Sequence, residues 1–140
     1  MKYLVDSNIF LRFAVPENKK MYEECRQFLA LIDQGELETY ATDLIIAEVQ
    51  WVMVKFYKLP KALAVNTIET IVGQPNLLIY PAIPWLIAIS IYEQKNVKFI
   101  DATTAAIIYS EDSNDWAVVS YDRDFDKLGV KRLEPKDILR

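Results

Sequence analysis

The segment that decides the fold is KYLVDSNIFLR, residues 2–12. The strand-like run Lys2–Val5 leads directly into Asp6, and an apolar run resumes two residues later. Aspartate, serine and asparagine are all good helix caps, so Asp6-Ser7-Asn8 could simply be a turn that starts a helix. The alternative is that Asp6 ends a buried strand because that end faces a functional crevice. The rest of the chain has to distinguish the two interpretations.

The composition predicts one soluble globular domain over residues 1–140, with 52% hydrophobic and 26% charged residues. A single cysteine, Cys25, cannot form an internal disulfide, which indicates a reducing compartment, and we expect the cytoplasm. The uncharged run 77–92 contains Pro81 and Pro84 and is shorter than the ~20 residues of a membrane-spanning helix. We therefore expect no membrane association.

The most informative absence is histidine, of which the chain has none. This excludes Ser-His and Cys-His catalysis, zinc sites that use imidazole, and ribonuclease chemistry based on histidine. The net charge of −4 argues against a nucleic-acid partner, because binding to phosphates usually needs positive charge. That objection weakens if several acids cluster around bound cations.

Short apolar runs alternate with helical patterns along the whole chain. Such alternation predicts an α/β fold with a short, mostly parallel central sheet that is covered by helices on both faces. The expected strands are 2–5, 38–41, 77–80, 117–120 and 131–133. The expected helices are 17–34, 43–57, 61–72, 84–94 and 101–110, with a short one after Asp124 and another after Pro135.

Acidic residues occur at four unusual places in this pattern. Asp6 and Asp122 each follow a strand, so both are expected beyond the carboxyl edge of the sheet, where open α/β folds place their sites. Glu48 lies within the apolar segment LIIAEVQWVMVKF, where it could instead pair with Lys55 or lie at a solvated edge. Asp101 begins a helix and could be only its cap.

Each of these acids alone would be interpreted as structural, but together they predict one metal site. At an effective dielectric constant of 20, two carboxylates about 4.5 Å apart repel each other by roughly 3–4 kcal/mol. A fold would hardly tolerate several such pairs unless a cation were bound. Oxygen ligands without histidine or cysteine suit Mg²⁺ or Mn²⁺. A calcium loop at Asp122-x-Asp124-x-Asp126 is rejected, because the required Gly and Glu positions hold Lys127 and Leu133.

Four motifs in this order resemble the PIN-domain nucleases, most of all the VapC-type toxin ribonucleases of toxin–antitoxin pairs. They are YLVDSNIFLR, LIIAEVQW, KFIDATTAAI and VVSYDRDFDKL, followed by GVKRLEPKDIL. The resemblance extends from Lys2 to Leu139, although residues 57–92 match only by the order of elements. It implies a three-layer α/β/α PIN-like fold and an endoribonuclease that uses Mg²⁺ or Mn²⁺. It also implies a homodimer and a small antitoxin protein as partners.

By the same resemblance, the catalytic acids are Asp6, Glu48, Asp101 and Asp122. The metal ligands are Asp6, Asp101 and Asp122, with Asp124 as a further ligand. Ser7 and Ser120 match positions where the family has small hydroxyl residues beside the acids, and we expect both to contribute to substrate binding.

The expected reaction is attack of metal-activated water on an RNA phosphodiester, which leaves 5′-phosphate and 3′-hydroxyl ends. Arg12, Lys55 and Arg123 are candidate phosphate contacts because each lies close in sequence to a site acid, although all three could be ordinary surface charges. A receiver domain and a haloacid-dehalogenase-type phosphatase fit poorly, because the first strand is followed by only one acid. A stronger alternative is a non-catalytic PIN-like module that binds RNA or acts as a scaffold.

Overall fold

A computed structural model describes residues 1–139, and a five-stranded parallel sheet forms its centre. The strands are β1 (Lys2–Val5), β2 (Glu38–Ala41), β3 (Leu77–Ile79), β4 (Trp116–Val119) and β5 (Arg132–Leu133). Their order across the sheet is β3-β2-β1-β4-β5, and β1 pairs with both β2 and β4. The chain therefore adds β2 and β3 on one side of β1 and later adds β4 and β5 on the other side. This makes the junction of β1 and β4 the switch point at which such folds form a crevice.

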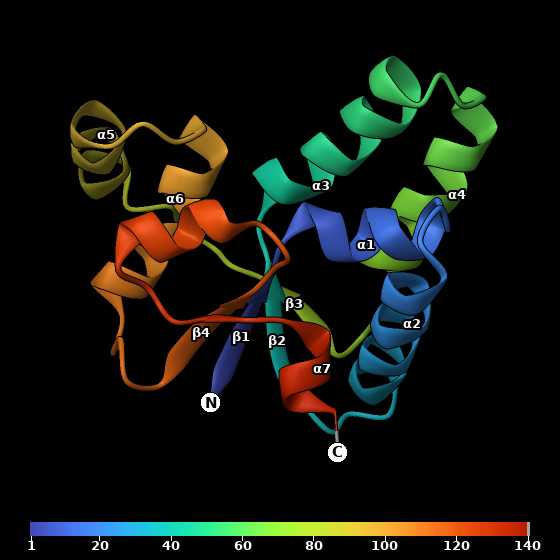
Figure 1. Ribbon diagram of the computed structural model, residues 1–140, viewed down its shortest axis with the longest axis horizontal. Coiled ribbons are helices and arrows are strands. Elements are labelled where there is room, and N and C mark those ends of the chain that lie inside the picture. Colours follow the sequence, from blue (N-terminus) through green and yellow to red (C-terminus); the bar gives the residue numbers. More distant parts are fainter. Residues whose placement is uncertain (140) are drawn as a thin grey trace.

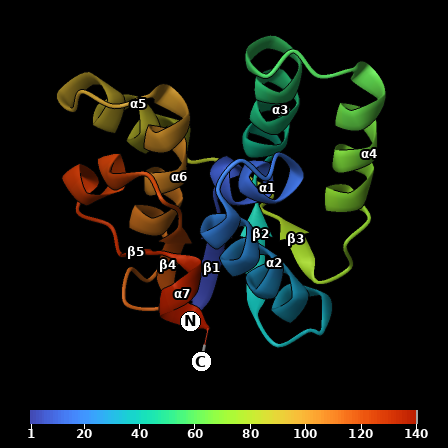
Figure 2. The same ribbon diagram turned by 45° about the vertical axis from the view of Figure 1, so that its right-hand side comes forward.

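Helices lie on both sides of this sheet (Figure 1). The α-helices are α1 (Ser7–Ala14), α2 (Lys19–Asp33), α3 (Asp43–Trp51), α4 (Lys61–Val72), α5 (Trp85–Gln94), α6 (Phe99–Ser110) and α7 (Pro135–Ile138). A π-helical segment, η1 (Val52–Phe56), continues α3, and a 3₁₀ helix, η2 (Arg123–Leu128), follows β4. Helices α1 to α4 lie on one side of the molecule and α5, α6 and η2 on the other (Figure 2).

The two faces of the sheet bury two separate hydrophobic clusters. Because successive strand residues point to opposite faces, Leu4 and Val118 belong to one cluster while Val5 and Val119 belong to the other. The first cluster packs against α6 and η2, through residues such as Ala105 and Phe125. The second packs against α1, α2, α3 and α4. The predicted three-layer α/β/α architecture with a parallel sheet is therefore confirmed.

Three differences between the predicted elements and the structure bear on the site. Helix α1 was not among the predicted helices, and it begins directly after Asp6, which caps it. The helix expected over 43–57 is not uniform, because from Val52 onward it becomes π-helical and the Tyr57 amide donates to the Val52 carbonyl. Helix α6 begins at Phe99, two residues before the predicted start at Asp101. This last difference matters for the role of Asp101.

Candidate active site

Asp6 joins the first strand to the first helix, and its interpretation as a helix cap is correct. Its side chain caps α1 by accepting a hydrogen bond from the Ser7 amide at 2.8 Å. It also accepts from Asn8 Nδ2 at 3.1 Å and from the Ser120 hydroxyl at 2.6 Å, so it is fastened to the end of β4. The capping role, which could have belonged to Ser7, therefore belongs to Asp6. The buried carboxylate lies at the β1/β4 switch point.

The two predicted serines support acids in this structure. The buried Ser120 hydroxyl donates to Asp6 and accepts from the Asp122 amide at 2.9 Å, so it links two of the predicted site acids. The Ser7 hydroxyl donates to a carboxylate oxygen of Glu48 across 41 positions of sequence. Their expected contacts with substrate stay predictions.

Glu48 reaches the site from α3, which begins at the Thr42 cap. Thr42 accepts a hydrogen bond from the Ile45 amide at 3.1 Å and so sets where the helix starts. The half-buried Glu48 carboxylate then meets Ser7 at the start of α1. In the described part of the chain it makes no ion pair with Lys55, so the salt bridge considered for it is not formed.

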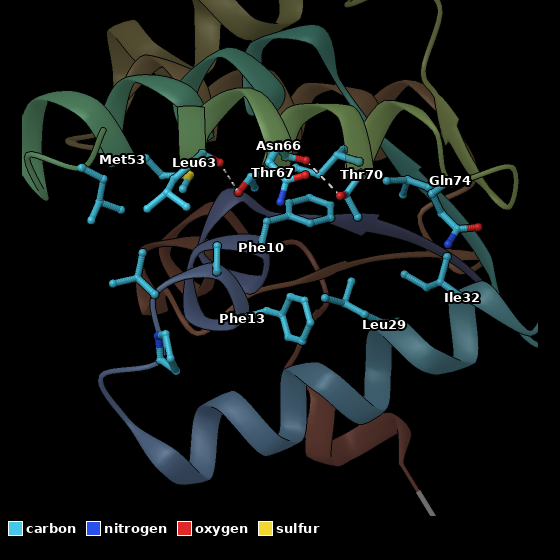
Figure 3. Close-up of a pocket in the computed structure, with 16 residues that line it drawn as sticks. Phe10, Phe13, Leu29, Ile32, Met53, Leu63, Asn66, Thr67, Thr70 and Gln74 are labelled. Atoms are coloured by element: carbon cyan, nitrogen blue, oxygen red, sulfur yellow. Dashed lines mark hydrogen bonds between the residues drawn. The ribbon is translucent and has the colours of Figure 1, made fainter. Parts of the chain in front are cut away.

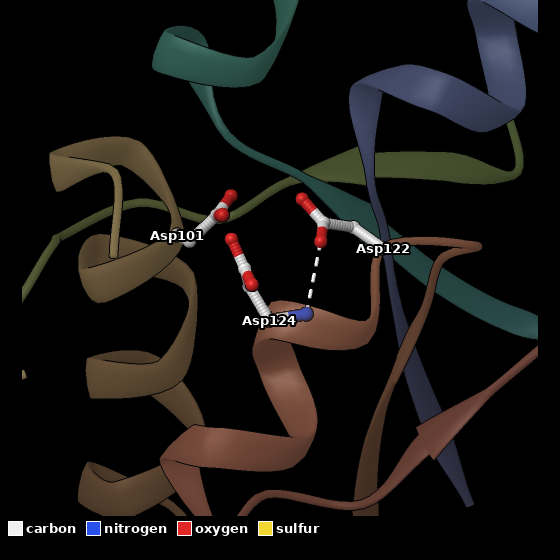
Figure 4. Close-up of side chains that lie close together, drawn as sticks. All are labelled: Asp101, Asp122 and Asp124. Atoms are coloured by element: carbon white, nitrogen blue, oxygen red, sulfur yellow. Dashed lines mark hydrogen bonds between the residues drawn. The ribbon is translucent and has the colours of Figure 1, made fainter. Parts of the chain in front are cut away.

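Three aspartates from two distant segments converge in Figure 4. Asp101, Asp122 and Asp124 each present a carboxylate oxygen, and these oxygens lie within 4.8 Å of one another. Asp122 is the cap of η2 and accepts a hydrogen bond from the Asp124 amide at 2.9 Å (Figure 4). That bond fixes how the two acids of the 3₁₀ helix are placed relative to each other.

Asp101 is the most unusual of these residues. Its side chain is only 1% exposed, and its Oδ2 atom has no hydrogen-bond partner within residues 1–139. The cap of α6 is Lys98, and Asp101 lies in the first turn of the helix. The interpretation of Asp101 as a helix cap is therefore wrong. A buried carboxylate oxygen without a partner is costly and calls for an explanation such as a bound cation.

The electrostatics of the crevice show that its acids repel one another. Burial, followed by the charges of Asp6, Asp122 and Glu48, raises the pKa of Asp101 to about 7, although nearby Lys98 opposes this. Burial also raises the pKa of Asp6 to about 6, with Glu48 contributing, although the hydrogen bonds from Ser120 and Ser7 oppose it. The folded chain thus disfavours the ionised form of both acids. A divalent cation would reverse this preference.

The residues present fit a hard divalent cation. Asp101, Asp122 and Asp124 offer oxygen ligands at mutual distances that one ion could bridge, and Asp101 Oδ2 is free to coordinate. Asp6 lies outside this three-residue group, and both of its oxygens accept protein hydrogen bonds. Its place as a fourth metal ligand stays a prediction. Asp6 and Glu48 nevertheless couple electrostatically to Asp101.

The basic residues around the crevice differ from the sequence-based choices. Burial raises the pKa values of Cys25 and Tyr57, and the charge of Arg12, in the last turn of α1, opposes both shifts. Arg12 therefore lies on the α2 side. Lys55 and Arg123 are exposed at η1 and η2. Lys98, which sequence reasoning missed, lies near Asp101, Asp6, Asp122 and Glu48. Its position three residues before Asp101 was the available signal.

A second hollow lies away from the acids, between α2 and α4 (Figure 3). It has a volume of about 540 Å³ and is lined mainly by apolar side chains from α1, α2, η1 and α4. They include Phe10, Phe13, Leu29, Ile32, Met53, Leu63 and Ile71. We call this hollow the apolar groove. It contains none of the acidic residues of the crevice.

Comparison with protein families identifies the fold. The model of the PIN domain matches residues 3–131. The chain belongs to the PIN domain family. PIN domains are nucleases, and the crevice described above is formed by residues within the matched region. No curated protein matches the chain.

Solved structures with the same fold cover almost the whole chain. PAE2754 from Pyrobaculum aerophilum has a TM-score of 0.70 and 18% identity, covering 99% of this chain and 93% of its own. VapC20 of Mycobacterium tuberculosis, described as a sarcin-ricin loop cleaving toxin, has a TM-score of 0.68 and 11% identity, covering 91% and 95%. VapBC2 from Rickettsia felis, bound to a DNA fragment from its promoter, has a TM-score of 0.65 and 13% identity, covering 96% and 98%. At these identities the likeness is one of fold.

Within residues 1–139, no helix is both long and apolar enough to cross a membrane.

Proposed function

We propose that this PIN domain is a metal-dependent endoribonuclease that acts in the cytoplasm. The observation that carries the proposal is the buried, unpartnered Oδ2 of Asp101 beside the carboxylates of Asp122 and Asp124. Purely structural acids would have acquired hydrogen-bond donors at this depth. A non-catalytic scaffold would not need to retain so costly an arrangement.

The chain's own residues have separate tasks in this proposal. Asp101, Asp122 and Asp124 would hold Mg²⁺ or Mn²⁺, with Asp6 as a further candidate ligand. Such an ion, when bound, lowers the pKa of water and stabilises negative charge on a phosphate. Ser7 and Ser120 orient Glu48 and Asp6 by hydrogen bonds, which keeps both carboxylates aimed at the crevice. With no histidine in the chain, hydrolysis to 5′-phosphate and 3′-hydroxyl ends is the expected outcome.

The proposed physiological role is that of a toxin paired with a small antitoxin. Support comes from the ordered sequence motifs and from structural neighbours that are named as a VapC toxin and a VapBC complex. The acidic crevice suits a basic segment of such an antitoxin, and the apolar groove suits an apolar one. Helix α1 connects the two places, since Ser7 begins it at the crevice while Phe10 and Phe13 line the groove. One partner chain can therefore cover both.

We also propose that the protein forms a homodimer through α5. This helix exposes apolar side chains, with Trp85 49%, Leu86 85% and Ile89 50% accessible, and Phe99 at the start of α6 extends the patch. Clustered exposed apolar residues usually mark a protein interface. Sedimentation of the wild type and of Leu86→Asp should give a dimer and a monomer, respectively. Identical sedimentation would reject this interface.

The experiment that tests the enzymatic proposal is cleavage of labelled single-stranded RNA. Mg²⁺ or Mn²⁺ should support cleavage, Ca²⁺ should support it poorly, and EDTA should abolish it. Cleavage that continues in EDTA would reject the metal-dependent mechanism. An absence of cleavage with every ion, together with retained RNA binding, would favour the non-catalytic module.

A further inference from the structure

Lys98 is an exposed cation at the start of α6, three residues before the buried Asp101, and it is not paired to any single acid. Lys98 is the N-terminal cap of α6, and its carbonyl accepts a hydrogen bond from the Ala102 amide at 3.1 Å. This bond fixes the backbone of Lys98 at the start of the helix turn that contains Asp101. Its side chain remains accessible to solvent. Within residues 1–139 it forms no direct ion pair. Its ammonium is therefore available to a ligand.

The charge of Lys98 acts on four acids of the crevice. Partial burial by itself would lower its pKa, but the carboxylates of Asp101, Glu48, Asp6 and Asp122 outweigh that effect and raise it. In return, Lys98 acts to lower the pKa values of Asp6 and Asp101. Lys98 is thus positively charged at neutral pH and lies close enough to influence the acids that line the crevice.

The charge balance of the crevice explains what such a cation is needed for. Asp6, Glu48, Asp101, Asp122 and Asp124 remain net negative when ionised, even after one divalent cation is bound. A phosphodiester approaching them would be repelled, because each like-charge pair near a protein surface costs energy over several ångströms. The nearby Lys127 is already engaged with Asp124 at 3.0 Å. Lys98 is a cation without an ion pair in residues 1–139, and its charge acts on four of these acids.

We infer that Lys98 binds a phosphate oxygen of the RNA strand at the mouth of the crevice. The inference rests on the proposed nuclease function and assigns a substrate contact to it. A lysine suits this task because its ammonium is a compact charge on a flexible stem, which can meet a phosphate without fixed geometry. The competing interpretation is that Lys98 serves only as a counter-ion that lessens repulsion among the acids.

The two interpretations predict different binding behaviour. Binding of a fluorescein-labelled single-stranded RNA is measured by anisotropy in Ca²⁺, where cleavage should be slow, at several salt concentrations. For Lys98→Met we expect about tenfold weaker binding, as for loss of one charge-assisted contact. The slope of log affinity against log salt should become shallower by roughly 0.7, the value for one phosphate contact on a single strand. Lys98→Arg should restore both quantities.

Lys95→Met is the matched control. Lys95 is an exposed lysine at the end of α5, three residues away, and its loss removes the same charge. We expect the RNA affinity of Lys95→Met to stay within about twofold of the wild type. Its salt slope should change by less than about 0.2, which is small beside the slope of one phosphate contact. The Mg²⁺-induced rise in melting temperature, measured without RNA, should not fall in Lys98→Met. A stronger Mg²⁺ response would be compatible with the inference, since a competing cation has been removed.

Two results would overturn the inference while the nuclease proposal stands. One is unchanged RNA affinity and salt slope in Lys98→Met. The other is an altered Mg²⁺ response with unchanged RNA binding, which would make Lys98 a counter-ion only. If the wild type binds RNA but never cleaves it, the nuclease proposal fails while the binding measurements still decide the role of Lys98. If the wild type neither binds nor cleaves RNA, both fail.

Discussion

The crevice and the apolar groove are built on opposite physical principles, although α1 contributes to both. The crevice gathers carboxylates from β1, α3, α6 and the segment after β4, and burial raises the pKa values of Asp6 and Asp101. The groove gathers apolar side chains from α1, α2, η1 and α4 and leaves Phe13 and Leu63 partly exposed. Neither region is satisfied by the chain alone. We expect the first to bind a cation and the second to bind an apolar partner.

Because the two regions differ in this way, we expect mutations in the crevice and mutations in the groove to change different properties of the protein. Removing a charge in the crevice should relieve repulsion and destroy chemistry. Adding a charge in the groove should leave chemistry intact and weaken association. Stability, cleavage and partner binding are therefore three separate readouts.

The largest effect is expected for Asp101→Asn. Cleavage should fall by about 10²-fold or more, because a group that stabilises developing charge or holds the metal is lost. The metal-free protein should become more stable by about 1–3 kcal/mol, since one of several repelling charges is gone. Thermal melting with and without Mg²⁺, alongside RNA cleavage, measures both effects. Mg²⁺ should raise the melting temperature of the wild type more than that of the variant.

Asp33→Asn is the control for this prediction. Asp33 is exposed at the end of α2 and accepts a hydrogen bond from Gln74, which an asparagine oxygen can also accept. Cleavage and Mg²⁺ response should equal those of the wild type. An Asp101→Asn protein that keeps both properties would show that the unpartnered oxygen has no role in metal binding.

A somewhat smaller effect is expected for Leu63→Lys in the groove. Leu63 is 49% exposed on α4, so the change should cost little stability, while a charge placed in an apolar interface should weaken antitoxin binding by about 2 kcal/mol, or roughly 30-fold. The measurement is the dissociation constant for the proposed antitoxin, with RNA cleavage in parallel. Glu69→Lys, on the same helix but outside the groove lining, is the control. Equal affinity of Leu63→Lys and wild type would exclude the groove from the interface.

The smallest effect concerns pH and sharpens the electrostatic side of the comparison. The raised pKa values of Asp101 and Asp6 mean that, between pH 4 and 7, the native state binds more protons than the unfolded state. Stability of the metal-free protein should therefore fall as pH rises through this window. We expect the wild type to lose roughly 1–2 kcal/mol more than Asp101→Asn between pH 5 and 7.5 in EDTA. Melting curves in which the two proteins change in parallel would show that burial and the neighbouring charges do not raise the pKa of Asp101.

Much of the fold could be predicted because the sequence pattern is local. Apolar runs bounded by polar residues give all five strands to within one residue at each end, and the helix at 61–72 is predicted with its observed bounds. Helix α1 was left out of the predicted helices, although the sequence shows good capping residues at its start and Asp6 does cap it. The π-helical segment was missed because a shift of one hydrogen-bond register leaves no mark on an apolar run.

The candidate site was predictable only in part. The carboxyl ends of parallel strands lie at the same edge of a sheet, so the sequence could predict that Asp6 and Asp122 lie at one edge. The closeness of Asp101, Asp122 and Asp124 depends on how α6 packs against η2, and no local pattern contains that information. Lys98 was missed for the same reason, since its orientation follows from where α6 begins.

The order of the strands also has a consequence for the order of events during translation. The residues that line the apolar groove lie between Phe10 and Leu77, whereas the crevice requires Asp101, Asp122 and Asp124. At synthesis rates of about 5–20 residues per second, the roughly 50 residues that follow Leu77 take a few seconds to appear. The strands β1, β2 and β3, which form one side of the sheet, are made before β4 exists. The residues that a partner would meet in the groove are thus synthesised before the acids that complete the crevice.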